Sequence, residues 1–378
     1  MKRFFQKLHH FFAALWRAAP VRHVLLLIGL ALLGVYLLLR RHPAAMATLS
    51  RGFVRPWHRL MSRLTAPLPF SLGEWLIAAG VLALLVYALW TVAGIIRLGD
   101  RALRLYRFVL SCLTALVLVY AGFSYFWGVY YDCSDFEDQS GIRGRAVSAG
   151  ELETVTRYFT DRVNALAPLV RRDAEGRCRE ELWTIFDHSR VLYHAVEQTV
   201  PCLAGDEVPA KPFFFSRILS RLNFSGFFFP FTAEANINTD CPTALTAATV
   251  AHELAHQRGV AQEDEANFVA VLACLSDGDP VFCYSACLLA YIHLGNALYE
   301  ADYDAWLDNY ARLSAPVRAD LAENNAYWQQ FKSPVSQVSD AVYTGFLHSY
   351  GQTLGLKTYG KCVDLLVAYY YDEAARGN

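Results

Sequence analysis

The chain has 378 residues, of which 54% are hydrophobic and only 18% are charged, and its formal net charge is −1. This composition departs from that of an ordinary soluble protein. The near-neutral charge gives no basis for a nucleic-acid partner.

Three uncharged apolar runs dominate the N-terminal part: residues 24–39, 75–96 and 108–130. Each is close to the length that a helix needs to cross about 30 Å of hydrocarbon. Arg40 and Arg41 follow the first run directly, where a cleaved signal peptide would carry small residues. The sequence therefore predicts a membrane domain over residues 1–131 with three transmembrane helices, in a multi-pass protein whose partner is the lipid bilayer of the cell membrane.

Orientation in the membrane is only weakly encoded. The N-terminal arm and the first loop carry nearly equal numbers of basic residues, so the positive-inside rule does not decide which side of the membrane each lies on. The segment after the third run is acidic, and eight of the nine cysteines lie beyond that run. Both observations favour an extracytoplasmic C-terminal domain with disulfides. The candidates are Cys133, Cys178, Cys202, Cys241, Cys274, Cys283, Cys287 and Cys362. Buried thiols are an equal alternative for Cys283 and Cys287.

Residues 132–378 are numerous enough for a domain with its own core. Helical periodicity dominates it, and an extended segment is expected within Asn223–Asn238. The run at Val281–Tyr299 is almost apolar enough to be a fourth span, but charges and Pro280 flank it, so a buried core helix is expected. The expected helices are Gly150–Leu169, Cys178–Val200, Thr243–Gln257, Asp264–Leu275, Val281–Tyr299, Tyr303–Ser314, Pro316–Gln330, Ser336–Tyr350 and Lys357–Ala375.

Residues 252–256 read HELAH, and this is the most informative motif of the chain. Residues four apart project from the same helix face, so His252 and His256 can present two imidazole nitrogens to one Zn²⁺ ion. Glu253 lies beside them and is the candidate catalytic general base. Asp240 and Pro242 are expected to begin this helix and Gly259 to end it. A chance match on a surface helix is the alternative, but the apolar neighbours indicate burial, and buried charge needs a partner such as a metal.

The third metal ligand is expected just after the glycine, at Glu263 or Glu265. These lie about 200° apart around a helix, so only one of them can bind the same ion. We prefer Glu263, because Asn267 lies four residues later on its face and can accept the second N–H of a ligating histidine. Glu265 is the alternative, since in an antiparallel helix pair its position along the helix axis is nearer to that of the histidines.

The runs FFFPFTAEANIN (227–238), HELAHQRG (252–259) and EDEANF (263–268) together resemble an uncharacterised family of bacterial multi-pass membrane proteins. The runs SYGQ (349–352), GLKTYG (355–360) and VDLL (363–366) add to that likeness. The family is regarded as glutamate-type zincins, or gluzincins. The EDEANF element is also similar to ImmA/IrrE-type metallopeptidases, which place more residues between it and the histidines. The resemblance implies a mainly α fold in which the transmembrane helices precede a mostly helical zincin-like metallopeptidase domain.

Together these features predict a membrane-anchored zinc endopeptidase that acts on peptide or protein substrates. Phe231–Asn238 is a candidate to pair with the substrate backbone, or is equally a connector packed under the metal helix. His293, Tyr343, His348 and Tyr359 are possible oxyanion stabilisers without a spacing argument. The alternative function is a non-catalytic membrane receptor or assembly factor with a structural or ligand-binding zinc site, and hydrolysis of another amide is a weaker third.

Overall fold

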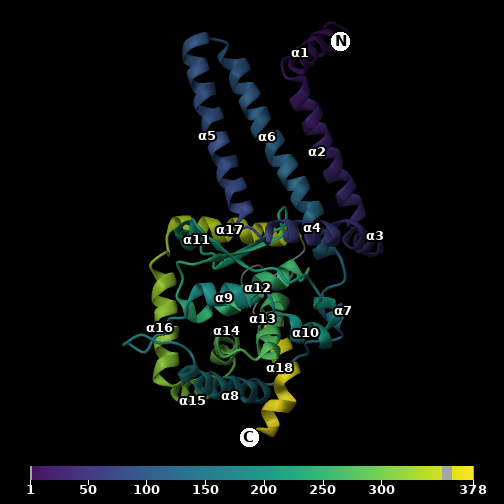
Figure 1. Ribbon diagram of the computed structural model, residues 1–378. Helices are drawn as coiled ribbons and strands as arrows, with labels where there is room; N and C mark the ends of the chain where they lie inside the picture. Colours follow the sequence, from purple (N-terminus) through teal and green to yellow (C-terminus); the bar gives the residue numbers. More distant parts are fainter. Residues whose placement is uncertain (1, 351–359, 378) are drawn as a thin grey trace. The chain divides into compact units, whose positions relative to one another are not determined.

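A computed structural model describes residues 2–350 and 360–377, and it is mainly helical with one small sheet (Figure 1). The chain divides into two compact units. The first comprises Met1–Val54 and Gly73–Asp132, and the second comprises Arg55–Leu72 and Cys133–Asn378. The division differs from the expected boundary at residue 131 mainly because Arg55–Leu72, which lies between two apolar runs in sequence, belongs with the C-terminal unit.

The first unit is built from long apolar helices. Its elements are α1 (Lys2–Ala18), α2 (Pro20–Leu39), α3 (Pro43–Leu49), a π-helical turn η1 (Ser50–Val54), α5 (Leu72–Leu98), α6 (Arg101–Phe126) and a 3₁₀ turn η2 (Gly128–Asp132). The helices α2, α5 and α6 contain the predicted apolar runs and are long and apolar enough to cross a membrane. At most 22% of each apolar window is buried within the protein, and exposed apolar surface of this extent is typical of helices in a hydrocarbon environment. The protein therefore has the helices of a membrane protein.

Close packing joins α2 to α6. A Cβ atom on Gly29 would lie 2.8 Å from Val117, so only glycine permits this approach of the two helices. At one end of the pair, the Asp132 carboxylate accepts a hydrogen bond from the Tyr36 hydroxyl at 2.8 Å and pairs with Arg40 at 3.3 Å. Helix α6 ends earlier than the predicted third run because the chain tightens into η2.

The second unit carries thirteen helices among the described residues. They are α4 (Arg55–Thr65), α7 (Phe136–Ser140), α8 (Ala149–Leu166), α9 (Leu182–His188), α10 (His194–Thr199), α11 (Ser216–Arg221), α12 (Thr246–Gln257), α13 (Glu263–Asp277), α14 (Pro280–Ala301), α15 (Tyr303–Arg312), α16 (Ala315–Gln329), α17 (Pro334–Ser349) and α18 (Gly360–Arg376). Short 3₁₀ turns occur at η3 (Ala167–Leu169), η4 (Pro201–Leu203) and η5 (Thr243–Leu245). Residues 357–359 of the last predicted helix, and residues 351–359 in general, lie outside the described part.

One predicted helix is wrong. Residues 178–200 form an extended start followed by α9 and α10, and not one helix. Cys178 pairs with Arg172 in an isolated antiparallel bridge, and its backbone N–H donates to the buried Asp320 carboxylate at 2.7 Å. These contacts hold the segment extended, and a tertiary partner of this kind is invisible to helical periodicity.

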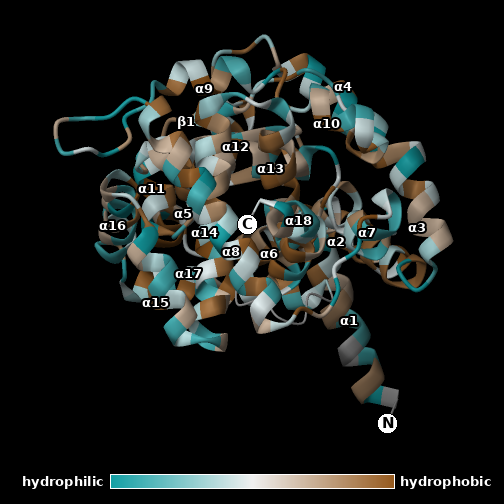
Figure 2. Cartoon of the chain, turned by 90° about the horizontal axis from the view of Figure 1, so that it is seen from below, coloured by the Kyte–Doolittle hydropathy of each residue, from teal (hydrophilic) through white to brown (hydrophobic). Residues whose placement is uncertain are grey.

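Helix α14 forms the centre of the second unit, where it packs against α8, α12 and α13. It meets the length and hydropathy of a membrane span, yet 72% of its apolar window is buried inside the protein. Figure 2 shows the hydrophobic character of α12 and α13, most of whose side chains are buried in the same core. The burial of α14 distinguishes it from α2, α5 and α6.

The sheet has three strands in the order β1, β3, β2. Strand β3 (Glu234–Asn238) is central: it runs parallel to β1 (Lys211–Phe213) and antiparallel to β2 (Gly226–Phe229). The expectation that Phe231–Asn238 pairs with a substrate is therefore wrong, because both edges of β3 are occupied. All five β3 residues are buried and α12 packs on the strand, which fits the alternative of a connector under the metal helix.

All nine cysteines lie among the described residues and none of them forms a disulfide there, which corrects the expectation of disulfides. Five of them, Cys178, Cys274, Cys283, Cys287 and Cys362, are buried. Burial raises the pKa of the Cys287 thiol to about 12, so it behaves as a small protonated hydrophobic group. Cysteine usage therefore no longer supports an oxidising compartment for this unit.

Candidate metal centre

The turn between α12 and α13 sets up the site. Gly259 has φ of +90°, a conformation that favours glycine, and the Val260 N–H then donates back to Ala255 O at 3.1 Å. The chain reverses within five residues and α13 begins at Glu263. The predicted role of Gly259 is thus confirmed.

The start of α12 differs from expectation. Asp240 does not cap it: its carboxylate accepts hydrogen bonds from Tyr327 at 2.6 Å and Ser220 at 3.0 Å, and pairs with Arg217. Pro242 instead precedes η5, and α12 continues from that turn.

His252 and His256 lie one turn apart with ring centroids 4.6 Å apart. The Nδ1 atom of His256 lies 2.7 Å from Val260 O, an acceptor, so Nδ1 must carry the proton. The Nδ1 atom of His252 lies 2.9 Å from Asn267 Oδ1. With both Nδ1 atoms donating, Nε2 is the nitrogen of each ring that would bind a metal, once it has lost any proton that it shares with Glu263.

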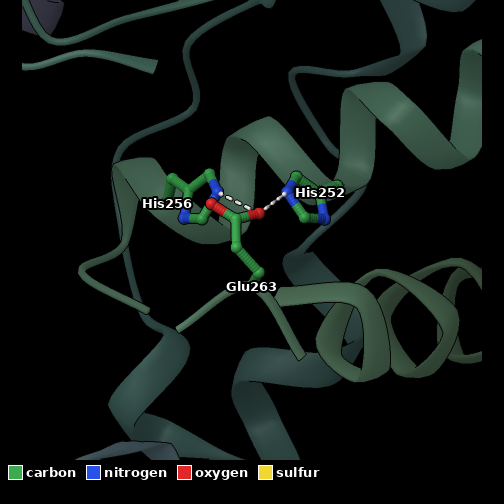
Figure 3. Close-up of side chains that lie close together, drawn as sticks. All are labelled: His252, His256 and Glu263. Carbon is green, nitrogen blue, oxygen red and sulfur yellow. Dashed lines mark ion pairs between the residues drawn. The ribbon is translucent and has the colours of Figure 1, made fainter. Parts of the chain in front are cut away.

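Glu263, in the first turn of α13, points at both Nε2 atoms (Figure 3). Its Oε2 lies 3.2 Å from His252 Nε2 and 3.6 Å from His256 Nε2. Its other oxygen, Oε1, accepts a hydrogen bond of 2.6 Å from the Tyr343 hydroxyl on α17. Tyr343, from a third helix, thus holds the carboxylate over the histidine pair.

These distances fit a zinc ion. Tetrahedral ligands at 2.0–2.1 Å from zinc lie about 3.3–3.4 Å from one another. The two measured nitrogen to oxygen separations bracket that value, and all three ligand atoms lie within 4.8 Å of one another. Two neutral imidazoles and one carboxylate are also a ligand set that zinc accepts.

Glu265, the alternative third ligand, faces another way. Its Oε1 lies 2.9 Å from Lys361 Nζ and its Oε2 accepts from the Phe136 N–H at 3.0 Å. It belongs to an acidic group with Asp135 and Glu137 around that lysine. The structure therefore brings Glu263, and not Glu265, to the histidines.

Glu253 is buried beside the histidines, on the same helix. A Cβ atom on Gly226 of β2 would lie 2.9 Å from its Oε1, so the strand approaches this carboxylate as closely as a glycine allows. Its Oε2 has no hydrogen-bond partner within the described residues. Burial raises the pKa of Glu253 to about 7, although the two histidines oppose this.

The electrostatics favour a charged Glu263. Burial alone would raise its pKa, but His256 and His252 hold the pKa well below the ordinary value. Burial lowers the pKa of His256, and the Glu263 carboxylate outweighs it, so the net pKa is raised to about 9. The three groups therefore form an electrostatically coupled cluster.

The suggested oxyanion stabilisers lie at different places in the unit. Tyr343 donates to Glu263, His293 is buried on α14 and His348 is exposed on α17. Tyr359 lies outside the described residues. Sequence reasoning missed Gly226 and Lys361 altogether, because their roles depend on contacts between distant segments and neither lies at a motif spacing.

Comparison with known proteins adds a family but no activity. A family model described as "Protein of unknown function (DUF3810)" matches residues 49–367, which is most of the chain. No curated protein and no solved structure matches the chain. The expected likeness to ImmA/IrrE-type metallopeptidases gains no support from these comparisons.

Proposed function

The chain belongs to this family of proteins of unknown function, and we propose that it is a membrane-anchored zinc-dependent endopeptidase. One observation carries the proposal. Two histidine Nε2 atoms and a carboxylate oxygen converge at separations suited to tetrahedral zinc, next to a buried glutamate whose Oε2 lacks a partner among the described residues.

The chemistry that a bound zinc ion would supply is Lewis acidity, which polarises a carbonyl group and makes water nucleophilic near neutral pH. His252, His256 and Glu263 would hold the ion. Asn267 and Val260 O fix the imidazole tautomers, and Tyr343 orients the Glu263 carboxylate.

Glu253 would be the general base. Its Oε2 takes the proton from the attacking water and later returns it to the leaving amine. Gly226 leaves room for this carboxylate between strand β2 and helix α12. The apolar surroundings of the helix exclude bulk water and so strengthen each electrostatic contact.

The substrate backbone would lie along β2. This strand is at the edge of the sheet and pairs only with β3 among the described strands. An extended peptide can add to such an edge through main-chain hydrogen bonds, and one end of β2, at Gly226, lies against Glu253. A peptide on this edge would thus reach the general base.

The first test is the zinc content of the detergent-purified chain by elemental mass spectrometry. We expect one zinc per wild-type chain, and its loss in both His256→Ala and Glu263→Ala. Glu265→Ala is the matched control, because this carboxylate serves Lys361, and it should keep zinc when folded. Absence of stoichiometric zinc in the wild type under non-chelating conditions would reject the proposal.

A second test separates an enzyme from a non-catalytic receptor. Glu253→Gln should keep its zinc and lose peptide cleavage by about 10²–10⁴-fold, the contribution of a positioned general base. A variant that retains both zinc and full biological activity would favour the receptor. Three ligand residues gather among the described residues, whereas a structural zinc site takes four.

A further inference from the structure

Helix α17 has its polar and apolar sides reversed. The side chains of Val335, Val338 and Val342 are 58%, 63% and 67% exposed and follow one another along one face. The side that faces the rest of the unit carries polar contacts beside the buried Leu347: Ser339 donates to Leu222 O at 2.9 Å, and Tyr343 donates to Glu263. A helix in contact with water would place these faces the other way round.

Two further helices expose apolar residues beside arginines. On α4, Leu60 and Leu64 are exposed next to the exposed Arg59 and Arg63. On α11, Ile218 is exposed between Arg217 and Arg221. Apolar side chains flanked by arginine are the pattern of helices that lie in the headgroup region of a bilayer.

A buried ion pair holds the sheet to the segment that leads into α5. Lys211 on β1 pairs with Glu234 on β3 at 2.9 Å, with both side chains almost fully buried. The Lys211 ammonium also donates to Phe70 O at 3.1 Å, and Glu234 accepts from the Leu72 N–H at 3.0 Å. Leu72 is the first residue of α5, so the sheet is attached at the point where the chain leaves for that apolar helix.

Helix α17 is attached to the same sheet through the segment between α11 and β2. Besides the Ser339 contact, Asn223 donates to Asp340 at 3.3 Å, and the rings of Phe224 and Tyr343 meet edge to face at 5.4 Å. Within the second unit, α4, α11 and α17 lie along one side, and α15 lies along the opposite side (Figure 1).

We propose that the outer face of α17, α11 and α4 rests on the lipid bilayer, so that the metal centre beneath α17 takes peptide segments held at the membrane surface. The substrate part rests on the proposed peptidase function. Two observations favour a bilayer as the occupant. Residues 66–71 join α4 to the apolar helix α5, and six residues span at most about 21 Å, so the end of α4 lies within that distance of the start of α5. Arginines also flank the exposed apolar side chains, and arginine is attracted to anionic lipid headgroups.

The lipid contact is tested without reference to activity. A photoreactive benzophenone amino acid replaces Val338 or Ile218 in the full-length chain, reconstituted in vesicles of phosphatidylethanolamine and alkyne-tagged phosphatidylglycerol. The matched control is Leu307, likewise an exposed apolar residue but part of α15, the helix on the opposite side of the unit. Tagged lipid should attach at the first two positions at least about tenfold more than at Leu307.

Three results would overturn the lipid contact: no lipid at Val338, equal labelling at Leu307, or crosslinking of Val338 to a second copy of the chain. The substrate class is tested with the double variant Val338→Asp and Val342→Asp, which should lower cleavage of a lipid-anchored peptide by about tenfold and spare the same peptide without its anchor. Equal loss on both peptides would overturn that part. If wild type labels lipid but cleaves neither peptide, the peptidase proposal fails and the lipid contact stands.

Discussion

Lys361 is expected to be one of the most sensitive positions for stability. It lies in the first turn of α18 and its Nζ is 2.9 Å from Glu265, 2.9 Å from Glu137 and 3.2 Å from Asp135. Glu265 is 1% exposed, and oxygens of the three carboxylates lie within 4.8 Å of one another. Replacing the lysine with methionine keeps its length and leaves three carboxylates without their shared cation.

Two estimates give the size of the effect. Removing one partner of a buried ion pair costs about 3–5 kcal/mol. The variant can instead protonate one carboxyl, and at pH 7 this costs about 3.7 kcal/mol for a group with an ordinary pKa near 4.3. Because Lys361 is about one quarter exposed, we expect a loss at the lower end of this range, so that the free energy of unfolding falls by about 3 kcal/mol. For a unit of this size that lowers the thermal midpoint by roughly 6–12 °C.

The pH dependence gives a second readout with a definite sign. Burial lowers the pKa of Lys361, but Glu265 and Glu137 outweigh it and the net pKa is raised, so the wild-type cluster keeps its cation throughout the neutral range. The folded variant binds one more proton than its unfolded chain, so its free energy of unfolding rises as pH falls, by about 1.4 kcal/mol per unit. The gap between variant and wild type should therefore narrow from pH 7 to pH 5.

The assay is thermal unfolding of the detergent-purified full-length chain, followed by tryptophan fluorescence. The double variant Lys361→Met with Glu265→Gln is the control, and it should recover part of the lost stability because it removes the buried charge. A midpoint within one degree or so of wild type, or a gap that widens at low pH, would refute the reasoning.

Three further substitutions test the site and its support. Gly226→Ala places a Cβ atom 2.9 Å from Glu253 Oε1 and should lower cleavage by about 10²-fold with zinc content unchanged; unchanged cleavage would argue against the assigned position of the base. Tyr343→Phe removes the hydroxyl that donates to the third ligand and should weaken zinc affinity by about 10–100-fold in a chelator competition, whereas equal affinity would make the contact incidental. Lys211→Met removes the buried ammonium that pairs with Glu234 and should lower the free energy of unfolding by about 3–5 kcal/mol, and a stability loss under about 1 kcal/mol would contradict this.

Local patterns carried a large part of the prediction. The uncharged runs coincide with α2, α5 and α6, because hydrophobicity over some twenty residues is a property of the segment alone. The spacing of His252 and His256 places both rings on one face of α12, and Gly259 adopts the positive φ expected of it. The amide of Asn267 lies at His252, since i to i+4 spacing on α13 brings it above Glu263.

Other predictions failed where the outcome depends on a distant partner. The segment 178–200 is periodic enough for a helix, yet its bridge to Arg172 and its bond to Asp320 hold its first residues extended. The sequence left Phe231–Asn238 equally open to substrate pairing or to a role as a connector, and only the pairing of β3 with β1 on one side and β2 on the other decides against the first. The expected disulfides are absent among the described residues, and five of the cysteines are instead buried, most of them in a core that several helices assemble.

The amino-acid sequence by itself determined the apolar helices, the paired histidines with their adjacent glutamate, and the turn that brings the next helix back, because each depends on neighbours within a few residues. Only the tertiary structure decided which glutamate faces the histidines. Glu265 is drawn to Lys361, nearly one hundred residues away, and Glu263 is held by Tyr343 from another helix. The two glutamates differ in the charged or polar partner that the folded chain places beside each carboxylate. The spacing of residues along one helix does not determine those partners.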